Sequence, residues 1–215
     1  MYLQTAGAAE RTLPPGSSHR YDTVEMRSIF ETRLYEAEIV EDRLLRDLAR
    51  SIRALAADDK AGQRWSKEHR YAGYTSYASL NDLPRRDPTI AKLAKILTQH
   101  ATVFAAECAF EFKSKPKLDS LWVNLLKSGG QHSGHIHPHS SISGTFYVEA
   151  PRASGAIRFE DPRLPLMMAA PPRPDTFVTI HPDAGLLLMW ESWLRHEVLP
   201  GTGRGERLSI SFNFA

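Results

Sequence analysis

Four of the nine histidines of this 215-residue chain lie in one short stretch, residues 131–147, which reads QHSGHIHPHSSISGTFY. Two of them, His135 and His137, are separated by a single residue. Side chains alternate between two faces of an extended segment, so both imidazoles would then lie on the same face. Imidazole is a common ligand of divalent transition metals, and the pair therefore indicates half of a metal site. A polar, His-rich surface loop is the alternative interpretation of this stretch alone.

The C-terminal stretch, residues 207–214, alternates strictly between polar and apolar residues and predicts a strand with two different faces. The residues on its polar face are Arg207, Ser209, Ser211 and Asn213. This face either meets solvent or binds a ligand, and an arginine suits a carboxylate because its planar guanidinium offers two parallel donors. His196 follows His137 by 59 residues and precedes Arg207 by 11. A third histidine on a distant strand would complete a metal site that keeps positions open for a co-substrate.

The secondary structure predicted to position these groups changes from helices to strands near residue 118. Before it, residues 41–58 and 87–108 carry apolar residues at helical spacing, and Asp87 suits the start of the second helix. After it, short alternating stretches are separated by turns that contain Pro and Gly. The predicted strands are 121–127, 143–150, 155–160, 176–181, 186–190, 194–199 and 207–214. Helices followed by many short strands predict a mainly β fold with flanking helices packed outside a sandwich or barrel.

Three segments have no clear period. Residues 1–22 are rich in small and polar residues and predict a flexible arm. Residues 60–86 hold an aromatic cluster that can line a nucleic-acid or sugar site, although loop packing is the more frequent reason for such a cluster. Its members are Trp65, Tyr71, Tyr74 and Tyr77. Residues 162–174 contain too much proline for regular structure and are either a lid over a site or an ordered surface loop.

The composition is that of a globular protein, with 42% hydrophobic and 24% charged residues. A formal net charge of +2 gives no reason to expect a nucleic-acid partner. The single cysteine, Cys108, excludes an intrachain disulfide and fits a reducing compartment. We expect a cytoplasmic protein without a membrane anchor, because we find neither an apolar stretch of membrane-spanning length nor a hydrophobic signal segment.

Four motifs occur in order within residues 118–215: HIHP with SGTFYV, then FEDPR, then WESWLRHEV, then GERLSISFN. Together they resemble the family of small 2-oxoglutarate/Fe(II)-dependent oxygenases with the pattern HxHPxSxxSGxYY, FxDPR, FPSWLxHxV and ERxSISFN. The resemblance implies a double-stranded β-helix, a cupin-like jelly-roll barrel with N-terminal α-helices packed outside. We expect one such domain over residues 23–215, with its helical part at 40–112 and its barrel core at 118–215.

The resemblance also implies a ligand set for Fe(II). His135 and His196 take the places of the two histidines of the usual facial triad. His137 stands where most oxygenases of this fold have Asp or Glu. His132 and His139 compete with His137 for the place of the third ligand.

The co-substrate residues follow from the same resemblance. Arg207 and Ser209 match the RxS pair that binds the far carboxylate of 2-oxoglutarate. Asn124 and Tyr147 are further candidates, for the co-substrate or for the surroundings of the metal. The implied activity is that of a dioxygenase, in the first place a hydroxylase, which uses O2 and converts 2-oxoglutarate to succinate and CO2 while it oxidises a primary substrate.

Two other classes of protein stay open at this point. One is a cupin-type metalloprotein with three histidines, a dioxygenase or an isomerase that does not use 2-oxoglutarate. Ser140 and Ser141 stand where a cupin would carry a glutamate, and Arg207 would have no role there. The other is a non-enzymatic jelly-roll binding domain. The sequence indicates neither the primary substrate nor the oligomeric state.

Overall fold

The computed structural model of the protein describes residues 27–163 and 175–215. The chain divides after Thr32, and the second unit, Arg33–Ala215, contains all of the described helices and strands. The arm predicted at residues 1–22, and residues 164–174 of the possible lid, lie outside the described residues. The expected start of the domain at residue 23 therefore stays a prediction.

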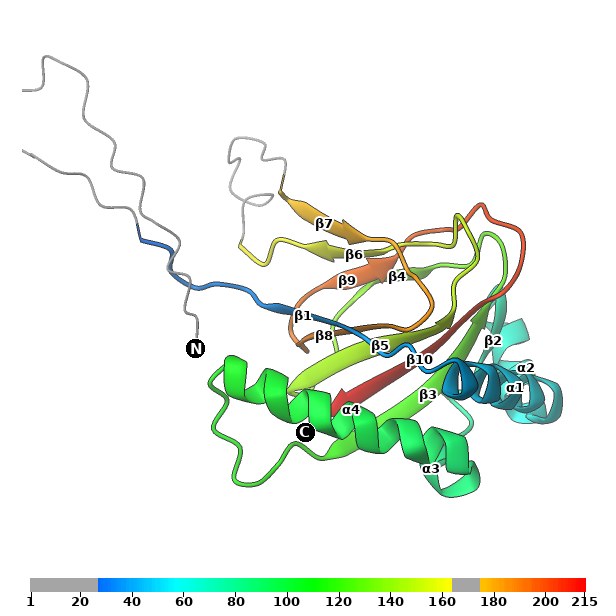
Figure 1. Ribbon diagram of the computed structural model, residues 1–215. Helices are drawn as coiled ribbons and strands as arrows, with labels where there is room; N and C mark the ends of the chain where they lie inside the picture. Colours follow the sequence, from blue (N-terminus) through cyan, green and yellow to red (C-terminus); the bar gives the residue numbers. More distant parts are fainter. Residues whose placement is uncertain (1–26, 164–174) are drawn as a thin grey trace, which may run out of the picture. The chain divides into compact units, whose positions relative to one another are not determined.

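A six-stranded antiparallel sheet forms the larger part of the β fold (Figure 1). Its strands are β1 (Leu34–Glu38), β2 (Gly73–Thr75), β3 (Leu118–Leu126), β5 (Ile142–Glu149), β8 (Leu186–Glu191) and β10 (Arg207–Phe214). They lie in the order β1-β8-β5-β10-β3-β2. Strands that are distant in the sequence are thus neighbours in the sheet, which is typical of a jelly-roll.

A four-stranded antiparallel sheet lies over one face of the larger sheet (Figure 1). It consists of β4 (His132–His135), β6 (Ile157–Glu160), β7 (Phe177–Ile180) and β9 (His196–Val198), in the order β4-β9-β6-β7. The two sheets together form the double-stranded β-helix expected from the sequence. All seven strands predicted from alternation are present among the described residues, with ends within three residues of the predicted ones.

The central strand β10 separates the core from the space between the sheets. It is hydrogen-bonded to β3 on one side and to β5 on the other. Its apolar residues Leu208, Ile210, Phe212 and Phe214 are completely buried in the main core. Three of its polar residues, Arg207, Ser209 and Ser211, line a cavity between the two sheets. The strict alternation in the sequence therefore predicted both the strand and its two different faces correctly.

Four helices accompany the larger sheet: α1 (Asp42–Asp58), α2 (Lys60–Glu68), α3 (Leu83–Arg86) and α4 (Pro88–Glu107). The apolar stripes of α1 and α4 are buried in the same core as the apolar face of β10. The Asp87 side chain caps α4 as expected, because it accepts hydrogen bonds from the backbone N–H groups of Thr89 and Ile90 at 2.7 and 3.1 Å. None of the described helices is both long and apolar enough to cross a membrane.

Asp59 connects the start of α2 to strand β2 through hydrogen bonds. Its carboxylate accepts hydrogen bonds from the Gly62 backbone N–H at 3.0 Å and from the Tyr74 hydroxyl at 2.8 Å. We expect Asp59→Ala to lower the free energy of unfolding by about 1–3 kcal/mol, because it removes a helix cap and leaves a buried hydroxyl without its acceptor. Urea unfolding followed by circular dichroism measures this change. The exposed neighbour provides the control Asp58→Ala, and equal midpoints for the two variants would contradict the prediction.

Candidate metal centre and co-substrate cavity

Strands β4 and β9 place two of the three predicted histidine ligands opposite each other. Their antiparallel register pairs His135 with His196, and the ring centroids are 4.4 Å apart. β4 ends at His135, so the expected strand alternation does not extend to His137. The loop holds His137 instead, since its backbone N–H donates to the carbonyl oxygen of Ser192 at 3.0 Å.

The three imidazoles converge on one point of the cavity. One nitrogen atom from each of His135, His137 and His196 lies within 4.8 Å of those of the other two. The Nε2 atoms of His137 and His196 are 3.3 Å apart. A metal ion about 2.1 Å from each nitrogen would separate the nitrogens by about 3–4 Å, so the spacing fits an ion. Within the described part of the chain, this group includes no Asp or Glu.

Backbone carbonyl groups determine which ring nitrogen can bind a metal. The Nδ1 atom of His135 lies 2.7 Å from the Ser133 carbonyl oxygen, and the Nδ1 atom of His196 lies 2.9 Å from that of Leu194. A carbonyl oxygen only accepts hydrogen bonds, so Nδ1 carries the proton in both rings. The lone pair of Nε2 is then free to face the metal, which is the usual arrangement of a histidine ligand.

Burial and neighbouring charges keep the rings of His137 and His196 neutral. Burial lowers the pKa of His137 to about 4, and the nearby charge that His135 can carry lowers it further. Burial also lowers the pKa of His196 to about 3, against the opposing effect of the hydrogen bond to Leu194. Neutral imidazole is the form that binds metals, so neither ring must lose a proton at neutral pH.

Two tryptophans enclose the histidines. The ring of Trp122 stacks on His137 with centroids 5.9 Å apart, and the ring of Trp190 contacts His196 edge-on at 4.6 Å. Both indoles line the cavity and are almost completely buried. They restrict the orientation of the two imidazoles and keep water from their sides. Their role was not identified from the sequence, although the alternation of β3 places Trp122 on the face opposite the core.

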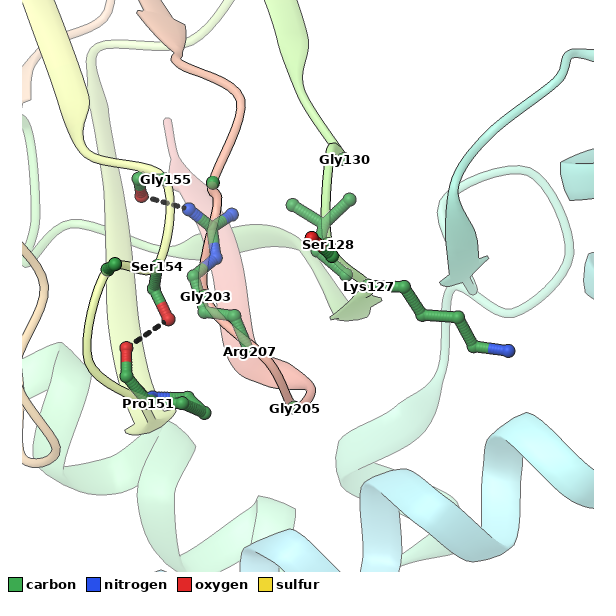
Figure 2. Close-up of a pocket in the computed structure, with 12 residues that line it drawn as sticks. Lys127, Ser128, Gly130, Pro151, Ser154, Gly155, Gly203, Gly205 and Arg207 are labelled. Carbon is green, nitrogen blue, oxygen red and sulfur yellow. Dashed lines mark hydrogen bonds between the residues drawn. The ribbon is translucent and has the colours of Figure 1, made fainter.

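Arg207 lies in the same cavity and has an unsatisfied donor. Its side chain is 5% exposed, and its Nη1 donates to the Gly155 carbonyl oxygen at 2.9 Å (Figure 2). Its Nε atom is buried without a hydrogen-bond partner, and no carboxylate among the described residues pairs with the guanidinium. A buried charge is costly unless it is paired, so the arrangement fits an anionic ligand that supplies the missing acceptor.

The other predicted co-substrate residues form one row across the larger sheet. The register places Ser209 opposite Asn124 on β3 and opposite Tyr147 on β5. Ser209 and Tyr147 line the cavity, and burial raises the pKa of the Tyr147 hydroxyl, which keeps it protonated. Asn124 is buried but is not among the lining residues. Its amide is hydrogen-bonded to Thr75 at 2.8 Å and to Ser211 at 3.1 Å.

His132 and His139, the two histidines weighed as alternative third ligands, lie outside the metal-binding group. His132 lines the cavity, and its Nε2 lies 2.8 Å from the hydroxyl oxygen of Tyr71. Tyr71 belongs to the aromatic cluster of residues 60–86. This segment contains α2, β2 and α3 as well as loops. No periodic pattern in that segment could have shown that Tyr71 reaches the cavity wall.

The comparisons with known proteins match the part of the chain that lines the cavity. Residues 120–213 match the model of a family described as "Putative 2OG-Fe(II) oxygenase". The matched segment contains all seven residues predicted for the metal and the co-substrate. This part of the chain is similar to that family, and the match supports an oxygenase enzyme that uses Fe(II) and 2-oxoglutarate. A comparison with curated proteins found no significant match.

Solved structures share the fold at low sequence identity. The non-heme alpha-ketoglutarate-dependent epimerase SnoN from nogalamycin biosynthesis is 18% identical, with a TM-score of 0.60 over 86% of this chain and 78% of its own. A prolyl-4-hydroxylase from Pseudomonas putida is 18% identical, with a TM-score of 0.59 over 85% and 92%. HygX from Streptomyces hygroscopicus, solved with nickel and 2-oxoglutarate bound, is 13% identical, with a TM-score of 0.55 over 86% and 82%. These likenesses show the fold alone.

The family description names Fe(II) and 2-oxoglutarate, and the donor set fits both of them. Three imidazole nitrogens suit a divalent iron. The buried Nε of Arg207 lacks an acceptor, which a carboxylate would supply.

Proposed function

We propose that the protein is an Fe(II)/2-oxoglutarate-dependent hydroxylase whose iron is held by His135, His137 and His196. The convergence of the three imidazoles in a cavity that also contains the unpaired Arg207 carries this proposal. The Nδ1 hydrogen bonds of His135 and His196 to backbone carbonyls support it, because they orient Nε2 toward a metal.

The far carboxylate of 2-oxoglutarate is then bound by Arg207 and Ser209. The free Nε of Arg207 supplies one donor and the Ser209 hydroxyl a second. The protonated Tyr147 hydroxyl is a further donor on the same row of the sheet. Asn124 has a supporting role, since its amide already bonds to Thr75 and to Ser211, which lines the cavity.

When bound together, Fe(II) and 2-oxoglutarate supply the activation of O2, in which the keto acid is oxidatively decarboxylated to succinate and CO2. The residues of this chain orient both ligands and exclude water from the centre through Trp122 and Trp190. His137 occupies the third protein position, which a halide ligand would otherwise need. Transfer of oxygen to the primary substrate is therefore the outcome that we expect.

The proposed function is tested by measuring which products contain oxygen atoms from isotope-labelled dioxygen. A metabolite extract, incubated with the iron-loaded enzyme, 2-oxoglutarate and ¹⁸O₂, is expected to yield ¹⁸O-labelled succinate and a product that has gained one ¹⁸O atom. Anaerobic addition of Fe(II) and 2-oxoglutarate should also give a visible charge-transfer band.

Other outcomes would distinguish the remaining possibilities. A product that has lost hydrogen or inverted a stereocentre without gaining oxygen would contradict the hydroxylase but retain the oxygenase. Iron binding without a charge-transfer band for any 2-oxo acid would contradict the use of 2-oxoglutarate and favour a cupin-type metalloprotein.

A further inference from the structure

His132 is a cavity-lining histidine to which the proposed metal site assigns no role. It lies at the start of β4, opposite Val198 of β9, and is half-buried. It is close enough to both Arg207 and His135 for the charge of each to act on it. 2-Oxoglutarate must span the space between Arg207, which is proposed to bind its far carboxylate, and the proposed metal ligands. His132 therefore lies beside this space.

The partner of its ring indicates where its proton is. The Tyr71 hydroxyl has one proton and two possible acceptors, His132 Nε2 at 2.8 Å and Asn124 Oδ1 at 3.3 Å. Asn124 Oδ1 already accepts a hydrogen bond from Thr75 at 2.8 Å. The contact to His132 is the shorter of the two, and a proton placed there makes Nε2 the acceptor of a hydrogen bond from Tyr71. The neutral ring then carries its own proton on Nδ1.

The Nδ1–H group of His132 is a donor without an acceptor. It forms no hydrogen bond with any residue that the structure describes, while the ring lines the cavity together with Arg207 and Ser209. Burial lowers the pKa of His132 to about 3, and the charge of Arg207 adds to this effect, so the imidazole is neutral. A neutral donor beside the arginine adds a directed hydrogen bond for an anion without adding a second positive charge.

We infer that His132 binds the far carboxylate of 2-oxoglutarate through its Nδ1–H, beside Arg207 and Ser209, and that Tyr71 is the positioning residue that sets this tautomer. This inference rests on the proposed function, because it assigns a third donor to the same co-substrate. His132 thereby strengthens the selection of keto acids that have a second carboxylate.

The test measures dissociation constants from the charge-transfer band, with iron-loaded enzyme under anaerobic conditions. Two keto acids are compared: 2-oxoglutarate and 2-oxopentanoate, which has a methyl group in place of the far carboxylate. The variants are His132→Leu, which removes the donor, His132→Asn, whose amide lies near the position of Nδ1, and Tyr71→Phe. Co(II) absorbance of each variant reports on the metal site independently.

We expect His132→Leu to weaken 2-oxoglutarate binding by about 10- to 100-fold, as for a hydrogen bond to a charged group. The affinity for 2-oxopentanoate and for Co(II) should stay unchanged. His132→Asn should restore most of the affinity for 2-oxoglutarate, and Tyr71→Phe should lose several-fold.

Two results would overturn the inference while the wild-type band appears. One is an equal loss for both keto acids in His132→Leu, and the other is loss of Co(II) binding, which would make His132 a metal ligand. If the wild-type enzyme gives no band with 2-oxoglutarate, the proposed function itself fails.

Discussion

The variant His196→Ala is expected to lose Fe(II) binding. His196 is 5% exposed, lies opposite His135 in the β4–β9 register, and has its Nε2 3.3 Å from that of His137. Its loss should lower the metal affinity by more than about 100-fold, because even residues that only orient a ligand contribute about 10- to 100-fold. Anaerobic equilibrium dialysis with Fe(II), or Co(II) absorbance, measures the change.

Matched variants separate this effect from general damage to the fold. The exposed His181 lies outside the metal-binding group, so His181→Ala should bind Fe(II) like the wild type. His137→Asp should retain binding, because two histidines with one carboxylate form the usual ligand set of non-haem Fe(II) oxygenases, whereas His137→Ala should weaken it. Normal Fe(II) affinity in a folded His196→Ala variant would contradict the proposed ligand set.

The variant Arg207→Ala is expected to lose the use of 2-oxoglutarate while it keeps the metal. The buried guanidinium has an unpaired Nε and no carboxylate partner among the described residues, so its charge is available to the co-substrate. A pair of charge-assisted hydrogen bonds contributes about 3–6 kcal/mol, which corresponds to a loss of about 100-fold or more in affinity. Titration of the charge-transfer band with 2-oxoglutarate measures this loss.

The controls for Arg207→Ala address charge and folding. Arg207→Lys keeps the positive charge but not the planar fork, and should recover only part of the affinity. The exposed Arg152 provides the variant Arg152→Ala, which should bind 2-oxoglutarate normally. Unchanged affinity for 2-oxoglutarate in Arg207→Ala, with Co(II) still bound, would show that the far carboxylate binds elsewhere.

The strands were predictable because the alternating pattern that indicates a strand lies within a few consecutive residues. Residues 207–214 alternate without exception, and a strand with one face in the core and one face on the cavity requires that pattern. The Asp87–Pro88 start of α4 was predictable for a similar reason, since a helix cap is a contact between residues that are close in the chain. Both features depend on residues only a few positions apart.

The secondary structure of residues 60–86 could not be predicted from local patterns. Their α2 and β2 carry no clear period, because β2 has three residues and α2 has nine. Asp59 supports α2 through Tyr74, which is 15 residues further along the chain. Tyr71 reaches His132 across 61 residues, and only the pairing of β2 with β3 brings that part of the chain to the cavity.

Residue types and motif order predicted the chemistry, namely three histidines and an arginine in motifs that resemble those of Fe(II)/2-oxoglutarate oxygenases. How these groups meet depends on the tertiary structure. Strand alternation could not bring His137 to the site, because β4 ends at His135 and a backbone hydrogen bond to Ser192 directs the loop. The register of β4 with β9 places His196 opposite His135, although 60 residues separate them in the chain. Such pairings depend on the packing of the two sheets, a long-range property that residue types and spacing do not contain.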